Sequence, residues 1–187
     1  MFYNGTVGDV ETIVSNVLAN SKCMVVKQLP KEYGRTTFDW DLWTKRPHYE
    51  ADILQKSLDK KLAGGKDQFY EEKWDVAGSN KPVYRVKDRA SGQVIADFMA
   101  MPSKTKGIYV VIGGVRWETL ENMKKVHRKI LSNPEMRHRH SKSRQDLQLI
   151  EAFETGLKTK RPADLQRFAP ILTTERFRFS KPLAWRF

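Results

Sequence analysis

The spacing of apolar residues changes period several times along the first half of the chain. Residues 7–20 place Val, Ile and Leu three or four positions apart, which predicts an amphipathic helix. The apolar run at residues 23–26 and the stretch at residues 35–43 predict two strands, and residues 51–62 return to helical spacing before two glycines. A helix, two strands and a second helix are therefore expected in this order.

In the middle of the chain, apolar and polar residues alternate as they do in paired strands. Residues 68–76 and 83–87 predict strands, and a turn at residues 88–92 leads into an apolar strand that contains Asp97. A further apolar run at residues 108–112 ends at a glycine pair and predicts another strand. These segments predict a sheet that includes a hairpin.

From Glu118 onward the pattern becomes helical. Apolar positions predict one helix that ends before Pro134 and a second around residues 147–157, so that the two helices can pack. Residues 158–187 combine three prolines and five aromatic residues without a period, which indicates an irregular basic arm. The expected fold is α+β: a mixed β-sheet flanked by helices over residues 1–157, with the helical pair at its C-terminal end, followed by the arm.

Positive charge is concentrated in the last third of the chain. The net charge is +12, yet residues 124–144 hold eight Lys or Arg against one acid, and residues 156–187 hold eight against two. The rest of the chain is close to neutral. Nucleic acid, with RNA favoured, is therefore the expected partner of this part, and a solvated basic helix with a basic tail is the alternative.

Composition narrows the class of protein. The single cysteine, Cys23, cannot form an internal disulfide framework and is typical of a reducing setting. No stretch approaches the roughly 20 apolar residues of a membrane helix, and the start lacks the basic and then apolar pattern of a signal peptide. We therefore expect a soluble intracellular protein that binds no membrane and is either cytoplasmic or associated with a virion.

Two acids dominate the candidate chemistry. Asp39 and Asp41 are two positions apart among aromatic and apolar residues, so in a strand they would project from one face. Adjacent carboxylates are stabilised by a cation between them, and a divalent metal with oxygen ligands is the usual one. Asp97, on a second apolar strand, is the expected third acid. Three such carboxylates are typical of metal-assisted phosphoryl or nucleotidyl transfer.

The order of these motifs resembles the nucleotidyltransferase-like superfamily of the polymerase-beta type, in particular its small members from viruses, mobile elements and toxin-antitoxin systems. The resemblance covers roughly residues 20–155. It is carried by Arg-Thr-Thr-Phe-Asp-Trp-Asp-Leu at residues 35–42, Val-Ile-Ala-Asp-Phe at residues 94–98, and the basic helical region at residues 120–144. It implies a mixed sheet flanked by helices.

The resemblance also implies the roles of particular residues. Asp39, Asp41 and Asp97 would be the catalytic residues and the ligands of Mg²⁺ or Mn²⁺. Nucleotide or nucleic-acid contacts are expected from basic and hydroxyl side chains, namely Arg35, Thr36, Lys125, Arg137, Arg139 and Lys142. The implied activity transfers a nucleoside monophosphate from a nucleoside triphosphate to a hydroxyl group on RNA or protein.

One motif of the superfamily differs in this chain. A Gly-Gly or Gly-Ser pair, whose backbone N–H groups hold the nucleotide phosphates, normally precedes the acids, whereas residues 27–33 are Lys-Gln-Leu-Pro-Lys-Glu-Tyr. Two interpretations stay open: an enzyme with a rebuilt site, or a catalytically degenerate scaffold that binds nucleic acid or serves in an assembly. A nuclease that combines one acid of the pair with Glu72 and Lys73 ranks third, because Asp97 then has no role.

Overall fold

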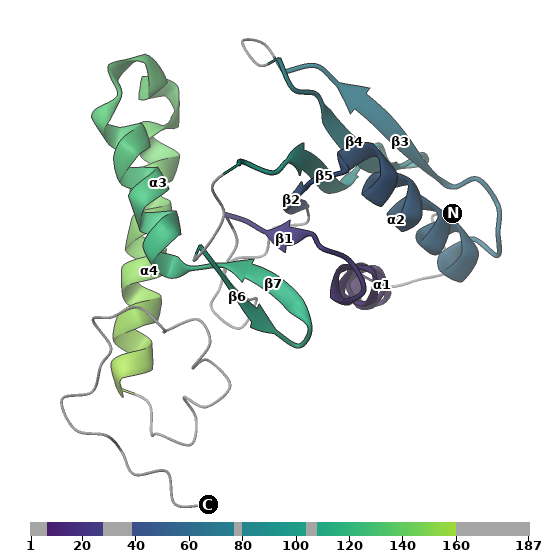
Figure 1. Cartoon of the computed structure of the whole chain (residues 1–187), viewed down its shortest axis with the longest axis horizontal. Coiled ribbons are helices and arrows are strands. Elements are labelled where there is room, and N and C mark those ends of the chain that lie inside the picture. Colours follow the sequence, from purple (N-terminus) through teal and green to yellow (C-terminus); the bar gives the residue numbers. More distant parts are fainter. Residues whose placement is uncertain (1–6, 28–38, 77–79, 104–107, 160–187) are drawn as a thin grey trace, which may run out of the picture. The chain divides into compact units, whose positions relative to one another are not determined.

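The computed structural model describes residues 7–27, 39–76, 80–103 and 108–159. The chain divides into two compact units, Met1–Glu118 and Thr119–Phe187. The first unit contains a sheet with two helices, and the second contains a helical pair (Figure 1).

In its described part, the first unit combines helices with one mixed sheet. The helices are α1 (Val7–Ala19) and α2 (Pro47–Leu62). The strands are β1 (Met24–Val25), β2 (Trp40–Thr44), β3 (Phe69–Trp74), β4 (Val83–Asp88), β5 (Val94–Ala100), β6 (Tyr109–Ile112) and β7 (Val115–Glu118). The α+β class expected from the sequence is confirmed.

The strands of the described residues form one seven-stranded sheet in the order β3-β4-β5-β2-β1-β7-β6. β2 runs parallel to β5 and β1 runs parallel to β7, while the other neighbouring pairs are antiparallel. The predicted hairpin is β4–β5, and its turn contains Gly92 with a φ of 69°, which suits glycine. β2 and β5 are separated in the chain by α2 and β3–β4, yet they are neighbours in the middle of the sheet.

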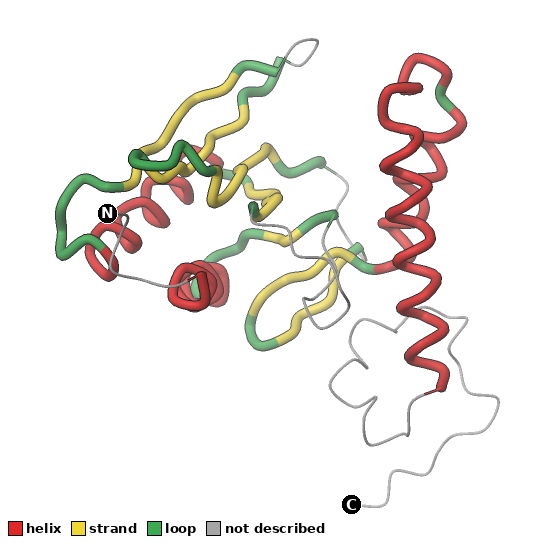
Figure 2. Tube along the Cα trace, turned by 180° about the vertical axis from the view of Figure 1, so that it is seen from behind, coloured by secondary structure: helices red, strands yellow, loops and turns green. Residues whose placement is uncertain are grey.

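One face of this sheet packs against α1 and α2, and Figure 2 shows these helices in red beside the yellow strands. Leu42 of β2, Val86 of β4 and Phe98 of β5 are fully buried there. They join Val14 of α1 and Leu54 of α2 in one hydrophobic cluster. Because side chains alternate along a strand, the residues between these apolar positions project from the other face of the sheet.

The second unit is the predicted helical pair. Its described elements are α3 (Leu120–Ser132), a 3₁₀ helix η2 (Pro134–Arg139) and α4 (His140–Thr159). Helix α4 begins earlier than the helix expected around residues 147–157. The His140 ring nitrogen Nε2 lies 3.0 Å from the carbonyl oxygen of Ile130 and 3.1 Å from that of Asn133, which fastens this early turn to the end of α3.

Two expectations concern the C-terminal arm and membrane-spanning helices. Residues 160–187, which make up most of the expected arm, lie outside the described residues, so the boundary after residue 157 stays a prediction. None of the helices in the described ranges is both long enough and apolar enough to cross a membrane.

Candidate functional site

Asp41 and Asp97 occupy directly opposed positions in the parallel strands β2 and β5. Both project from the face opposite to the core, since their neighbours Leu42 and Phe98 are fully buried on the core side. The side chains remain 27% and 15% exposed. The sequence predicted that each acid lies on a strand, and the structure confirms this and brings the two strands together.

Asp39 lies just ahead of β2 and is exposed. The expectation that it shares a strand with Asp41 is wrong, because pairing with β5 begins only where Trp40 faces Ala96. The negative charge of Asp39 nonetheless contributes to raising the pKa of Asp97. Asp39 therefore lies in the electrostatic neighbourhood of the strand-paired acids.

Each of the two paired carboxylates is held by a basic side chain. Lys27, which follows β1, places Nζ 3.0 Å from Oδ1 of Asp41. Arg85 of β4 donates from Nε to Oδ1 of Asp97 at 2.9 Å and from Nη2 to Oδ2 at 3.2 Å. The guanidinium carbon of Arg85 also lies 3.7 Å from the ring centre of Trp74. Bidentate pairing and stacking together fix the orientation of Arg85.

The same face carries a row of charged residues across four strands. The sheet register sets Glu72 opposite Arg85, Arg85 opposite Asp97, and Asp97 opposite Asp41. Neighbouring strands are about 4.8 Å apart, so Glu72 lies about 14 Å from Asp41. Glu72 instead accepts a hydrogen bond from Lys87 at 3.1 Å. The nuclease interpretation, in which Glu72 and an acid of the Asp pair act together, is therefore not supported.

The environment of Asp97 disfavours its negative charge. Burial raises its pKa above the ordinary aspartate value, the hydrogen bonds and charge of Arg85 lower it, and the charges of Asp41 and Asp39 raise it again. The net direction is upward. An additional positive charge beside these carboxylates would therefore be stabilising.

A metal ion fits the chemistry of this site, with one condition. Within the described part of the chain, no three His, Cys, Asp or Glu side chains form a ready-made metal cluster. Asp41 and Asp97 nevertheless offer the carboxylate oxygens that Mg²⁺ and Mn²⁺ prefer, on adjacent strands. Because Lys27 contacts Oδ1 of Asp41 and Arg85 contacts both oxygens of Asp97, a divalent ion shared by the two carboxylates would have to displace at least one of these contacts.

Sequence reasoning did not identify Lys27, Arg85 or Trp74 as site residues. Lys27 belongs to a stretch that was noted only for lacking glycine. Arg85 alternates with apolar positions in its strand, so a polar face could be inferred, but not the partner of the guanidinium. The sequence feature that could have identified them is a basic or aromatic residue on the same strand face as a candidate acid.

The remaining predicted contact residues fall into two groups. Arg35 and Thr36 lie outside the described residues. Lys125 of α3, Arg137 of η2 and Lys142 of α4 are exposed, and Arg139 of η2 is half-buried. All four belong to the second unit, and their roles stay predictions.

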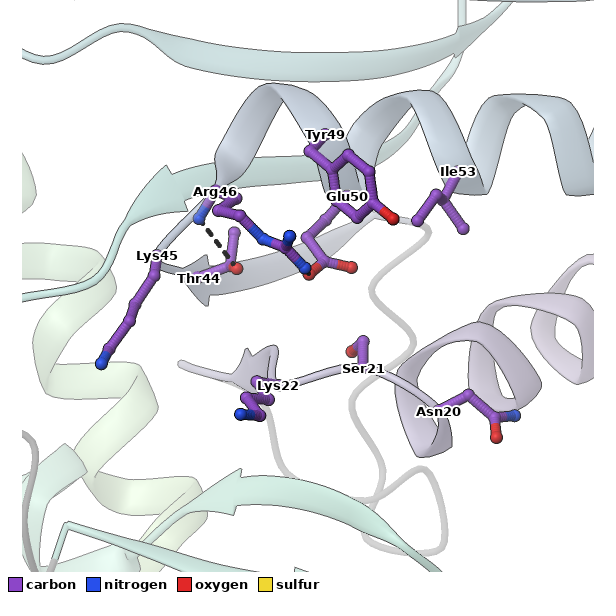
Figure 3. A pocket seen from close by; sticks show the side chains of 9 residues that line it. All are labelled: Asn20, Ser21, Lys22, Thr44, Lys45, Arg46, Tyr49, Glu50 and Ile53. Carbon is purple, nitrogen blue, oxygen red and sulfur yellow. Dashed lines mark hydrogen bonds and ion pairs between the residues drawn. The ribbon is translucent and has the colours of Figure 1, made fainter.

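The first unit also has an open pocket of about 560 Å³ at the end of β2 and the start of α2 (Figure 3). Lys22, Lys45 and Arg46 give its lining a positive charge. The Arg46 guanidinium lies 3.6 Å from the buried Glu50 carboxylate and 4.1 Å from the ring centre of Tyr49. None of the three predicted catalytic acids lines this pocket.

Comparisons with known proteins concern the fold. No protein-family model matches the chain, and no curated protein sequence does. The crystal structure of the Megavirus polyadenylate synthase is similar, with a TM-score of 0.55 and 15% sequence identity, and the match covers 77% of this chain and 30% of that one. The chain thus corresponds to less than a third of the viral protein's length.

Two Helicobacter pylori structures are less similar. For JHP933 the identity is 10%, the coverage is 70% of this chain and 57% of that chain, and the TM-score is 0.42. For a candidate nucleotidyltransferase of that organism the identity is 11%, the coverage is 71% of this chain and 60% of that chain, and the TM-score is 0.41. The mixed sheet with β2 beside β5, together with the likeness to the Megavirus structure, identifies the fold of this chain as nucleotidyltransferase-like.

Proposed function

We propose that the protein is a metal-dependent nucleotidyltransferase that moves a nucleoside monophosphate from a nucleoside triphosphate to a hydroxyl group on RNA or on a protein. The observation that carries the proposal is the direct opposition of Asp41 and Asp97, on the face opposite to the core of a nucleotidyltransferase-like sheet. Asp39, just ahead of β2, supplies a third carboxylate whose charge acts on Asp97.

In this proposal Asp39, Asp41 and Asp97 would hold Mg²⁺ or Mn²⁺, which would neutralise the triphosphate and its leaving group. The acceptor oxygen forms a bond to the α-phosphorus while the bond from that phosphorus to the bridging oxygen breaks, and pyrophosphate leaves. The hydroxyl proton passes to Asp97 or to water.

The nucleic-acid partner is part of the same proposal. Lys125, Arg137, Arg139 and Lys142 of the second unit, with Arg35 and Thr36, would contact the triphosphate or an RNA acceptor. Polyadenylate synthesis, the activity in the name of the Megavirus neighbour, is a transfer of the same class. Because the chain covers 30% of that protein, the base and the acceptor of this chain are a matter for direct measurement.

The test is transfer of radioactive label from each α-³²P nucleoside triphosphate, with Mg²⁺ or Mn²⁺, to RNA oligonucleotides and to protein acceptors. We expect transfer by the wild-type protein and a loss of at least about 100-fold in Asp41→Asn. Asp52→Asn is the matched control, because Asp52 pairs with Lys56 on the surface of α2. Transfer that survives in Asp41→Asn, or that is absent with every nucleotide and acceptor, would reject the proposal.

A second candidate is a non-catalytic scaffold that binds nucleic acid. It is favoured by the finding that Lys27 and Arg85 already neutralise Asp41 and Asp97. Its test is RNA binding at increasing salt, which should weaken steeply. An RNA affinity that does not fall with increasing salt would contradict it. So would RNA binding that survives deletion of residues 158–187 combined with charge reversal at Arg137 and Arg139.

A further inference from the structure

Lys27 has an unusual backbone conformation. Its φ is 59°, and no other non-glycine residue in the described ranges has a positive φ. A lysine is strained in this left-handed region because its Cβ approaches the following carbonyl oxygen. Its amide donates to Oε2 of the buried Glu118 at 2.9 Å, and the preceding Val26 amide donates to the Asp41 carbonyl at 2.9 Å. The surrounding strands therefore hold Lys27 in this conformation.

This conformation places the ammonium group of Lys27 on Asp41. Nζ lies 3.0 Å from Oδ1 of Asp41 and 4.0 Å from the sulfur of Met99. The Lys27 side chain remains 35% exposed, whereas that of Arg85 is 23% exposed and stacks on Trp74. Of these two basic side chains, that of Lys27 is the more exposed.

Lys27 and a divalent cation would compete for Asp41. Both are positive and both are attracted to the same carboxylate, so their mutual repulsion disfavours joint occupancy. Coordination of Mg²⁺ or Mn²⁺ by Asp41 would therefore favour departure of the ammonium from that carboxylate. The backbone of Lys27 is fixed by Glu118 and by β2, so the released ammonium can move away from Asp41 only as far as the length of the lysine side chain allows.

We propose that Lys27 releases Asp41 in this way and then binds the phosphate groups of the nucleoside triphosphate. The inference rests on the proposed function, because it requires a triphosphate beside Asp41 and Asp97. A lysine ammonium is a suitable phosphate ligand. Arg85 is less suited to this role, because its Nε and Nη2 donate to Asp97 and its guanidinium stacks on Trp74. Lys27 thus has two positions, one on a carboxylate in the free protein and one on phosphate in the complex.

Lys27→Gly is the informative variant, because glycine adopts a φ of 59° without strain while the ammonium is removed. Calorimetric titration with Mn²⁺ alone should show metal affinity raised by about tenfold or more, since the competitor is gone. Titration with a non-hydrolysable triphosphate at saturating Mg²⁺ should show nucleotide affinity lowered by about tenfold or more.

Controls separate this effect from changes in folding. Lys27→Asn also tolerates the left-handed conformation and should behave like Lys27→Gly, whereas Lys27→Arg should keep most of the triphosphate affinity. Lys56→Met removes another lysine that pairs with an aspartate, at 2.7 Å on α2, and should change neither affinity. Circular dichroism spectra that match the wild-type spectrum establish that each variant is folded.

The outcomes distinguish this inference from the function on which it rests. If the wild type binds Mn²⁺ and the triphosphate but Lys27→Gly shows unchanged or weaker metal affinity, or unchanged nucleotide affinity, the role of Lys27 is rejected and the proposed function stands. A wild-type protein that binds neither Mn²⁺ nor the triphosphate overturns both.

Discussion

Arg85 reaches across the β4–β5 pair to Asp97 and binds both of its carboxylate oxygens, at 2.9 and 3.2 Å. This ion pair lies among the half-buried residues of the open sheet face, where Asp97 is otherwise disfavoured as an anion. Removal of either partner would therefore leave a poorly solvated charge. The pair is the feature of the site whose energetic role can be measured without any ligand.

We expect Arg85→Met to lower the free energy of unfolding at neutral pH by about 1–3 kcal/mol, because Asp97 loses its counter-ion and its hydrogen bonds. Urea denaturation measures this loss. Arg89→Met is the control, since its pair with Asp67 is exposed and should contribute within about 0.5 kcal/mol. Equal losses in the two variants would contradict this account of the Arg85 pair.

Cys23 provides a prediction about pH. Burial raises the pKa of its thiol from an ordinary 9.0 to about 11. The folded protein therefore keeps the thiol proton at a pH where the unfolded chain loses it, so stability should fall as pH rises from about 9 to 11. Chemical denaturation across this range should show a smaller fall in Cys23→Ala. An equal fall in wild type and variant would contradict the prediction.

The same burial predicts the chemical reactivity of Cys23. Its side chain is almost completely inaccessible, and the thiolate is the nucleophilic form, so iodoacetamide at pH 8 should leave the folded protein unmodified. The unfolded protein in urea should react fully. Mass spectrometry measures the difference, and rapid labelling of the folded protein would count against this environment.

Two glycines with positive φ form a matched pair for a packing test. A Cβ at Gly114 would lie 3.3 Å from the Cβ of Ala19, whereas a Cβ at Gly92 would meet nothing within 4 Å. Both substitutions by alanine should cost about 1 kcal/mol for the left-handed backbone. Gly114→Ala should cost more than Gly92→Ala in urea denaturation, and the reverse order would contradict the proposed contact with α1.

In the second unit, Lys124 of α3 and Glu154 of α4 form an ion pair of 2.6 Å with both side chains largely buried. We expect Lys124→Met and Glu154→Gln each to lower the free energy of unfolding by about 1–3 kcal/mol. The double variant should cost less than the sum of the two single variants. A double-mutant cycle measures this coupling, and strict additivity would show that the pair contributes nothing specific.

The strands and helices that frame the site were predictable, whereas the arrangement of charges within it was not. The apolar runs around Asp41 and Asp97 identified both strands, because their neighbours are buried on one face. The parallel pairing of β2 with β5 depends on long-range packing, and no local pattern encodes it. Asp39 was assigned to the strand because spacing alone cannot show where pairing with a neighbour begins.

The β-bulge in the β4–β5 hairpin makes the pairing of Arg85 with Asp97 unpredictable from the turn alone. At its turn the hairpin pairs Lys87 with Val94, and a regular register from there would set Arg85 opposite Ala96. The register shifts between Val86 and Lys87, which moves Arg85 opposite Asp97. A prediction from the turn and the period of two therefore places the arginine one residue away from its acid.

The parallel alignment of β2 with β5 also has a kinetic consequence. The β4–β5 hairpin joins segments that are close in the chain, so it can form early, whereas β2 must find β5 across α2 and the whole β3–β4 pair. A nascent chain whose β5 segment has not yet emerged from the ribosome cannot contain the Asp41–Asp97 pair. The slow closure of this long loop, more than any local step, should set the moment at which a newly made molecule first forms the Asp41–Asp97 pair.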